Sequence, residues 1–348
     1  MCTVGHAAVI SVMYPPDGIC QYLFYTDVVI VEGSILASRE QNSWRLFQMK
    51  ARVYKKVKSG IAFDHRTTTS RLLTDAKKEL ATLASNNIDN YGLLNVIRKP
   101  GHLRSVVRAM KPVVDKLKNM QGSDPDKRTV IAIGSYDYSK PDFMDKYKEI
   151  IVDVVNTFKA DAVIAISSVG LMEDDSTCYA APPTVLISPM TRFPSLETHW
   201  PLVRANATYD KGEVLVGVSF EMAAMIYVLM HDAPNLNSSA YAKCKGFGLT
   251  SRDAICGPRK TVDQKVQLLK NPYVVYASFV NDKTSKHVIF AEYFTSARDK
   301  FTAARRKFGS VRTRVALMLF TSTSGTCEGS AAPTHLASVK WSARIEGC

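Results

Sequence analysis

The stretch "YGLLNVIRKPG", residues 91–101, decides the fold class. It contains an apolar run that suits a buried strand: Leu93, Leu94, Val96 and Ile97. The run ends on a cation, Arg98, and then breaks at Pro100 and Gly101. A charge at the end of a buried strand costs free energy unless it is solvated, paired or used. The meaning of Arg98 therefore depends on the sheet to which this strand belongs.

Seven further strand-like runs alternate with helix-like segments along the chain. They are residues 6–14, 22–31, 59–64, 129–136, 161–169, 213–220 and 314–321. Several are apolar throughout, which indicates parallel strands buried on both faces. Eight strand–helix units predict an α/β protein with a closed (β/α)8 TIM barrel. The alternative, an open doubly wound sheet, normally has a glycine-rich phosphate turn after its first strand, and "VMYPPDG" is not one.

The segment between the seventh and eighth strands is too long for a single helix. It includes the strand-like run "NPYVVYASFV", residues 271–280. We therefore expect a small inserted α+β subdomain around 226–285, within a barrel that occupies 1–329. The remainder, 330–348, is rich in Ser and Ala and is expected to be a loosely attached tail.

The net charge of +13 favours polyanionic or acidic partners. The densest basic run, residues 297–314, reads as a helix with Phe301 and Phe308 inward. Its outward residues would be Arg305, Arg306 and Lys307. A solvated helix face is the simpler interpretation, and no specific nucleic-acid module accompanies the run. No apolar stretch is long enough for a membrane span, and no signal peptide is visible.

The seven cysteines are scattered, and no two have the C-x-x-C spacing of zinc or thioredoxin-type sites. We expect no metal and no cofactor. Wide spacing fits either buried thiols or long-range disulfides. Asn206 and Asn237 lie in sequons and would be glycosylated if the chain were exported.

In parallel barrels the working groups stand at the C-terminal ends of the strands. The side chains at the predicted ends are Asp27, Asp64, His65, Arg98, Tyr136, Asp137, Ser168, Glu221 and Thr321. Arg98 is thus expected at the end of the fourth strand, facing the mouth. A charge there would take a partner, and we expect Asp64 or Glu221 to supply it.

Six segments follow one another along about 6–327 of the chain. They are "ICQYLFYTDV", "YGLLNVIRKPG", "ADAVIAISSVGLMEDD" with its downstream "SPM", "KGEVLVGVSFEMA", "YAKCKG" and "SGTCEG". In this order they resemble the family 18 glycoside hydrolases, the chitinases and chitinase-like lectins. The second segment is similar to the fourth-strand signature D-G-x-D-x-D-W-E-Y-P-G, and it retains Gly92, Pro100 and Gly101.

The resemblance implies that catalysis has been lost. In that family the last acid of the signature protonates the glycosidic oxygen, and the preceding Asp orients the substrate's N-acetyl nucleophile. The acidic positions fall here on Tyr91, Leu94, Val96 and Arg98. A guanidinium cannot release a proton at working pH, so Arg98 can only donate hydrogen bonds and hold charge. The residues left to bind a ligand are Asp27, Asp64, Arg98, Tyr136 and Glu221.

The resemblance also implies an extracellular protein with disulfides. It pairs Cys244 with Cys327 and Cys2 with Cys20. A bridge between Cys178 and Cys256 is a further expectation.

Three function classes remain open. The first is an inactive chitinase-like barrel that binds a glycan or an extracellular protein. The second is a glycoside hydrolase with relocated carboxylates, Glu221 with Asp64 or Asp27. The third is a scaffold whose basic outer helices bind polyanions or proteins.

Overall fold

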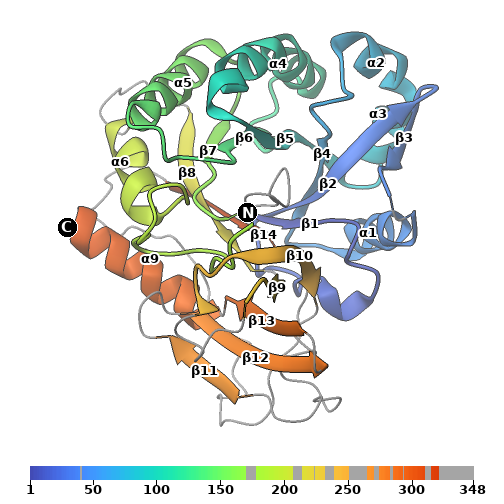
Figure 1. Ribbon diagram of the computed structural model, residues 1–348. Helices are drawn as coiled ribbons and strands as arrows, with labels where there is room; N and C mark the ends of the chain where they lie inside the picture. Colours follow the sequence, from blue (N-terminus) through green and yellow to red (C-terminus); the bar gives the residue numbers. More distant parts are fainter. Residues whose placement is uncertain are drawn as a thin grey trace.

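The computed structural model describes the chain up to residue 320, with internal gaps (Figure 1). The residues left out are 40, 170–177, 207–213, 223, 232–238, 251–264, 270–273, 283–284, 293, 310–314 and 321–348.

Nine strands of the described chain form one sheet, and eight of them are parallel and close into a barrel. The eight are β1 (Cys2–Val4), β2 (Tyr22–Val31), β4 (Lys58–Phe63), β5 (Ile88–Arg98), β6 (Thr129–Ser135), β7 (Ala162–Ala165), β8 (Leu215–Glu221) and β14 (Val315–Phe320). The ring closes because β1 pairs with β2 on one side and with β14 on the other. The ninth strand, β3 (Ser34–Ala37), extends β2 as an antiparallel hairpin. The predicted TIM barrel is confirmed.

One strand prediction is wrong. The first strand is Cys2–Val4, whereas residues 6–14 form turns and the short helix η1 (Ser11–Met13). All three residues of β1 are buried, but Val9 and Ile10 are 45% and 49% exposed. The run 6–14 is longer and more apolar than β1, so hydrophobicity alone favoured the wrong segment.

Helices surround the barrel (Figure 1). They are α1 (Gln41–Val53), α2 (Ser70–Asp75), α3 (Lys77–Ala84), α4 (Pro100–Gln121), α5 (Phe143–Thr157), α6 (Leu196–Asn206) and α9 (Phe294–Phe308). Pro100 opens α4 directly after β5, because its fixed φ suits the first helical position and it needs no amide partner. In α1, Trp44 and Phe47 are buried against the barrel, whereas Val53 at the end of the helix is 67% exposed.

A second sheet lies between β8 and β14 in the chain and below the barrel in Figure 1. It is antiparallel, in the order β10-β9-β13-β12-β11. Its strands are β9 (Ala224–Leu229), β10 (Cys244–Thr250), β11 (Lys265–Leu269), β12 (Val274–Asp282) and β13 (Ser285–Ala291). We expected an insertion over about 226–285, and the strands of this sheet run from Ala224 to Ala291. The α+β character and the domain limits stay predictions, and the tail 330–348 lies outside the described residues.

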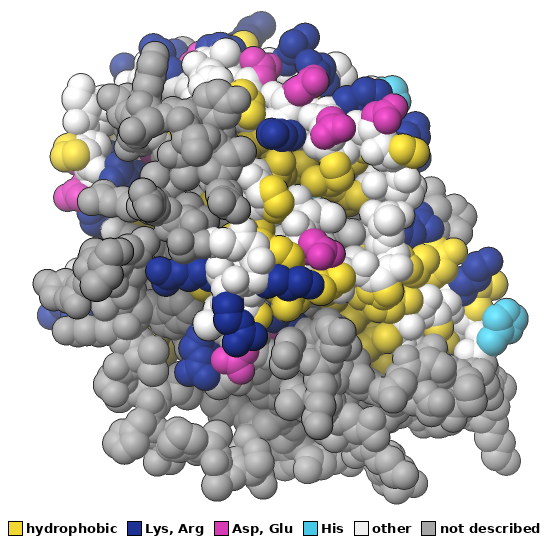
Figure 2. All heavy atoms as spheres, turned by 90° about the vertical axis from the view of Figure 1, so that its left-hand side faces the viewer, with side chains coloured by type: hydrophobic (Ala, Val, Ile, Leu, Met, Phe, Trp, Pro, Cys, Tyr) yellow, Lys and Arg dark blue, Asp and Glu magenta, His cyan; other side chains and the backbone are white. Residues whose placement is uncertain are grey.

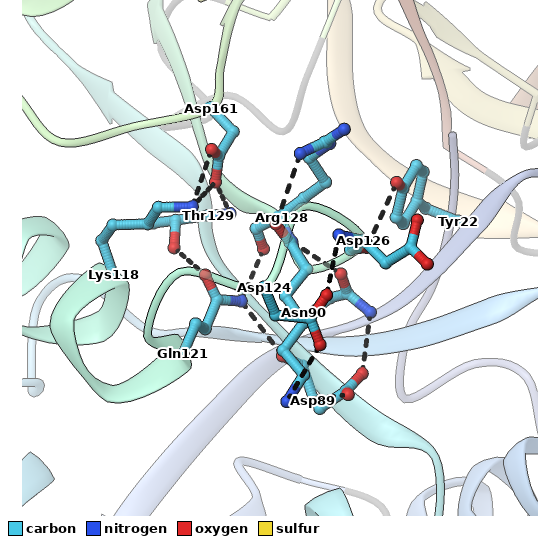
Figure 3. A network of polar contacts seen from close by, with 11 residues as sticks. Tyr22, Asp89, Asn90, Lys118, Gln121, Asp124, Asp126, Arg128, Thr129 and Asp161 are labelled. Atoms are coloured by element: carbon cyan, nitrogen blue, oxygen red, sulfur yellow. Dashed lines mark hydrogen bonds and ion pairs between the residues drawn. The ribbon is translucent and has the colours of Figure 1, made fainter.

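A polar network holds the N-terminal end of the barrel, the end that in this fold serves stability (Figure 3). Gln121 ends α4, and its side-chain amide donates to the carbonyl oxygens of Asp89 (3.0 Å) and Arg128 (2.9 Å). Its Oε1 accepts from Thr129 Oγ1 at 2.5 Å. Asp161 accepts from the Thr129 amide at 2.7 Å. One helix end is thereby joined to the starts of β5, β6 and β7.

We expect Gln121→Ala to lower the free energy of unfolding by about 1–3 kcal/mol, because it leaves buried backbone and hydroxyl groups without partners. Chemical denaturation of both proteins measures this difference. Gln48→Ala, on the half-buried face of α1, is the matched control and should change stability by less than about 0.5 kcal/mol. Equal losses in the two variants would contradict the role given to the network.

Candidate functional site

Arg98 is the last residue of β5, and β5 is the fourth strand of the barrel in chain order. It therefore lies at the strand end that sequence analysis assigned to it. Its carbonyl oxygen accepts from Ser135 Oγ at 3.0 Å and from the Tyr136 amide at 3.4 Å, which fixes it beside the end of β6. The Arg98 side chain is half-buried.

Two irregularities in the strands bring Asp27 and Asn95 together at this end. The pairing of β2 with β4 shifts register between Tyr25 and Val28, and Asp27 there has a φ of 60°. The pairing of β5 with β6 shifts register between Leu93 and Val96, around Asn95. Asn95 Nδ2 donates to Asp27 Oδ1. Bulges next to sites re-aim side chains, and a left-handed Asp carries strain that the surrounding contacts must hold.

Asp64 follows β4 and is bound by its neighbour Arg66, not by Arg98. Arg66 Nη2 lies 2.7 Å from Asp64 Oδ2, and Arg66 Nε lies 2.9 Å from Oδ1. Burial alone would raise the pKa of Asp64, but the hydrogen bonds and charge of Arg66 outweigh it and hold that pKa below its ordinary value. Arg66 was missed because its part in the site depends on a local turn that no motif marks.

The expected pairing of Arg98 with Asp64 or Glu221 is wrong. Within the described part of the chain, Arg98 forms no salt bridge with a carboxylate. Asp64 is already taken by Arg66, which is only two residues away and reaches it with little loss of side-chain freedom. Glu221 ends β8 at a different part of the mouth, where its amide donates to Thr184 Oγ1 at 2.9 Å.

Asp27 and Asp64 have pKa values displaced in opposite directions. Burial and then the nearby charge of Asp64 raise the pKa of Asp27, although Arg66 opposes this shift. Asp64 therefore stays ionised while Asp27 takes up a proton more readily than an ordinary Asp. The cluster thus contains one ion pair, Asp64 with Arg66, and one carboxyl group, Asp27, whose pKa is raised.

His65 lies in the same cluster and is 6% exposed. Neither of its ring nitrogens has a hydrogen-bond partner among the described residues, and the same holds for Asn95 Oδ1. Burial and then the charge of Arg98 lower the pKa of His65; Asn95 lies close enough to oppose the shift. The imidazole is therefore neutral at physiological pH, beside an arginine.

The positions that hold acids in the family 18 signature are built into the core here. Tyr91, Leu94 and Val96 are all buried, with exposures of 4%, 0% and 0%. Leu94 packs within the barrel against Phe24 and Ile164. Leu94 and Val96 carry no titratable group, and burial raises the pKa of Tyr91 to about 12.

Among the described residues, the remaining strand-end candidates form no hydrogen-bonded pair of a nucleophile and a base. Ser168 Oγ lies 2.8 Å from Ser219 Oγ, so its described partner is another hydroxyl and not a base. Asp137 lies 4.0 Å from Arg192 in an ion pair, and Tyr136 is half-buried beside Arg98. Thr321 lies outside the described residues, as does Asn237, while Asn206 is the last residue of α6.

One expected disulfide is present and two are wrong. Cys2 is bonded to Cys20, as predicted. Cys178 is bonded to Cys244, which replaces the expected pairs Cys244–Cys327 and Cys178–Cys256. The backbone explains the change, because the Cys244 amide donates to the Cys178 carbonyl oxygen at 3.1 Å and so brings the two segments together. Cys256 and Cys327 lie outside the described residues.

Within the described ranges, no cluster of three or more His, Cys, Asp or Glu side chains is placed to hold a metal ion. In the same part of the chain, no helix combines the length and the apolar character that a membrane span requires.

No protein-family profile matches the sequence, and no curated protein matches it. Solved structures do match, at low sequence identity. Chitinase ChiA74 from Bacillus thuringiensis has a TM-score of 0.58 and 11% identity over 93% of this chain and 67% of its own. Human YKL-39, described as a pseudo-chitinase with retained chitooligosaccharide binding, has a TM-score of 0.53 and 12% identity over 91% of both chains.

The multi-modular chitinase ChiW from Paenibacillus has a TM-score of 0.54 and 11% identity over 92% of this chain. The present chain spans 40% of ChiW's length. Identities this low establish a shared fold and no more. The resemblance drawn from the motifs is therefore confirmed at that level: the chain has the barrel fold of the chitinases and chitinase-like proteins of glycoside hydrolase family 18.

Proposed function

We propose that the protein is a catalytically inactive, secreted, chitinase-like barrel that binds a glycan or a protein partner at the mouth formed by its strand ends. The position of Arg98 carries this proposal. It ends the fourth barrel strand, where the resemblance places the general acid, and a guanidinium cannot give up a proton at working pH.

Binding without catalysis is consistent with the rest of the mouth. Family 18 chemistry needs an acid that protonates the leaving oxygen and a second carboxylate that orients the N-acetyl group. Asp64 is locked to Arg66, and the inner signature positions are apolar and buried. YKL-39 shows that a barrel of this fold can lose catalysis and keep oligosaccharide binding.

Secretion is supported by the disulfides. Bridges such as Cys2–Cys20 and Cys178–Cys244 persist in oxidising compartments and are rare in the cytosol. Under this proposal Asn206 and Asn237 carry N-linked glycans.

A hydrolase with relocated carboxylates is the second candidate. The opposite pKa shifts of Asp27 and Asp64 favour it, because acid catalysis by two carboxyl groups relies on environments that displace their pKa values in opposite directions. Glu221 at the end of β8 would be a further carboxylate at the mouth.

Binding of a polyanion outside the mouth is the third candidate. As predicted, Arg305, Arg306 and Lys307 of α9 are exposed, and Figure 2 shows a group of Lys and Arg side chains on the face that carries α5, α6 and α9. Arg298 and Lys307 are each near a carboxylate, at 3.3 Å and 3.9 Å. Such partly neutralised faces are also common where no partner binds.

Hydrolysis of a chromogenic N-acetylglucosamine oligomer, with calorimetry of the unmodified oligomer in parallel, separates these candidates. We expect measurable binding and no turnover. Turnover that persists in Arg98→Gln but disappears in Asp27→Asn or Glu221→Gln would contradict the proposal and establish the relocated hydrolase. Absence of binding to any oligosaccharide, with retained binding of a polyanion by α9, would favour the third candidate.

A further inference from the structure

Arg98 differs from the other arginines at the mouth. Arg66 is bound to Asp64 and Arg192 lies near Asp137, whereas Arg98 forms no salt bridge with any carboxylate that the structure describes. Its backbone carbonyl oxygen accepts from Ser135 Oγ at the end of β6, which fixes the point from which the side chain leaves the strand. A guanidinium without a carboxylate partner among the described residues can bind the planar, charged oxygens of a carboxylate or sulfate.

We propose that Arg98 holds the acidic group, a carboxylate or a sulfate, of a glycan bound at the mouth of the barrel. The inference rests on the function proposed above, because it requires that this mouth binds a glycan. It adds the preferred class of ligand: an acidic sugar, which should bind more tightly than a neutral N-acetylglucosamine chain.

The carboxylates around Arg98 are arranged so that an incoming anion meets little repulsion. The charge of Asp64 is offset by Arg66 through two side-chain contacts of 2.9 Å or less. Asp27 is bound by Asn95 and takes up a proton more readily than an ordinary Asp. The charge of Asp64 is therefore neutralised by Arg66, and Arg98 is left without an ion-pair partner among the described residues.

The mouth also has uncharged groups suited to a sugar. Asn95, half-buried beside Asp27, has an amide oxygen that is an acceptor without a hydrogen-bond partner in the described part of the chain. Tyr136 is a half-buried aromatic residue that follows β6, and its backbone amide donates to the Arg98 carbonyl oxygen. Sugars bind through such combinations of a ring surface and a few fixed polar atoms.

His65 provides a built-in reporter of the charge at Arg98. The groups that act on its ring are Asp64 and Arg66 from its own loop, and Asn95 and Arg98 from β5. Burial lowers the pKa of His65 and the charge of Arg98 lowers it further, so an anion bound to Arg98 should remove the second contribution and raise that pKa. A neutral ligand leaves the charge of Arg98 uncompensated and should not raise it.

The test uses calorimetry with trigalacturonate and with the neutral N-acetylglucosamine trimer, at low ionic strength, on the full chain. We expect the acidic trimer to bind more tightly, and Arg98→Gln to weaken its binding by about tenfold or more. Arg98→Lys, which keeps the charge but loses the fork, should have an intermediate effect. Arg104→Gln is the matched control, because it removes a cation paired with Glu149 on the outer helices, and it should leave affinity within about twofold.

NMR titration of His65 gives the second readout. Saturating trigalacturonate should raise the pKa of His65, and the neutral trimer should not. Unchanged affinity for trigalacturonate in Arg98→Gln overturns the inference, and so does a loss that occurs instead in Arg305→Gln/Arg306→Gln on α9. Equal binding of free sulfate and of the acidic trimer also overturns it, because the site would then select an anion and not a glycan.

The two proposals fail in different ways. Tight binding of the neutral trimer at the mouth, with no contribution from Arg98, rejects the acidic ligand and leaves the proposed function intact. Hydrolysis of either trimer rejects the proposed function. No binding of any sugar probe at the mouth rejects the acidic ligand and the glycan-binding form of the proposed function.

Discussion

Lys300→Met is expected to lower the free energy of unfolding by about 3–5 kcal/mol, because it leaves a buried carboxylate without its cation. Lys300 and Glu292 are both fully buried and form an ion pair. Lys300 Nζ also donates to the Thr184 carbonyl oxygen at 2.5 Å, and Ser296 donates to Glu292. The pair joins the end of the second sheet to α9 and to the loop that follows β7.

Denaturant unfolding of the single variants and of Lys300→Met/Glu292→Leu measures the pair. We expect the double variant to be more stable than Lys300→Met, since removing both charges also removes the desolvation penalty. Lys307→Met is the matched control on the same helix, where the side chain is half-exposed. A loss below about 1 kcal/mol for Lys300→Met would contradict the importance given to the buried pair.

Acid is expected to destabilise the protein through His199. This residue is fully buried, with its ring beside Tyr138 and Tyr147 at centroid distances of 5.1 and 5.5 Å. Burial lowers the pKa of His199 to about 4, and its hydrogen bond with the Ser195 carbonyl oxygen only partly opposes this. Nε2 has no hydrogen-bond partner among the described residues, so a proton bound there would have no acceptor.

The sign of the change in stability with pH follows from which state of the protein binds the proton. Between pH 6.5 and about 4 the unfolded chain protonates this histidine and the folded protein does not. Stability therefore falls as pH falls through this window, by up to about 3 kcal/mol below pH 4. Unfolding curves measured across the window should show a smaller slope in His199→Phe than in wild type. His102→Gln, at an exposed position of α4, should keep the wild-type slope, and parallel profiles for all three proteins would contradict the assignment.

The sequence predicts the barrel because seven of the eight ring strands are apolar runs with a charged or polar residue at the C-terminal end. Arg98 was placed correctly for this reason. The first strand was misplaced because three buried residues, Cys2–Val4, carry too little signal beside the exposed Val9 and Ile10. β1 is buried because it pairs with β2 on one side and β14 on the other, and these pairings cannot be deduced from the periodicity of its own sequence.

The site was less predictable because contacts between distant residues define it. Asn95 meets Asp27 across 68 positions, through bulges that no spacing marks. Asp64 was identified as a candidate, but its partner is Arg66, two residues along the same loop, and not a residue of another strand end. Cys178 and Cys244 pair because two backbone segments run side by side, and this cannot be deduced from cysteine spacing.

The closure of the barrel at β1 has a consequence for biosynthesis. Cys2 lies opposite Leu319, so the ring joins a strand that leaves the ribosome early to one that leaves it late. Until β14 emerges, one edge of β1 has no neighbour, and such edges are prone to aggregation. The Cys2–Cys20 bridge can form long before that and fastens β1 to the segment leading into β2. We therefore expect this early crosslink to protect the nascent chain while it waits for its last strand.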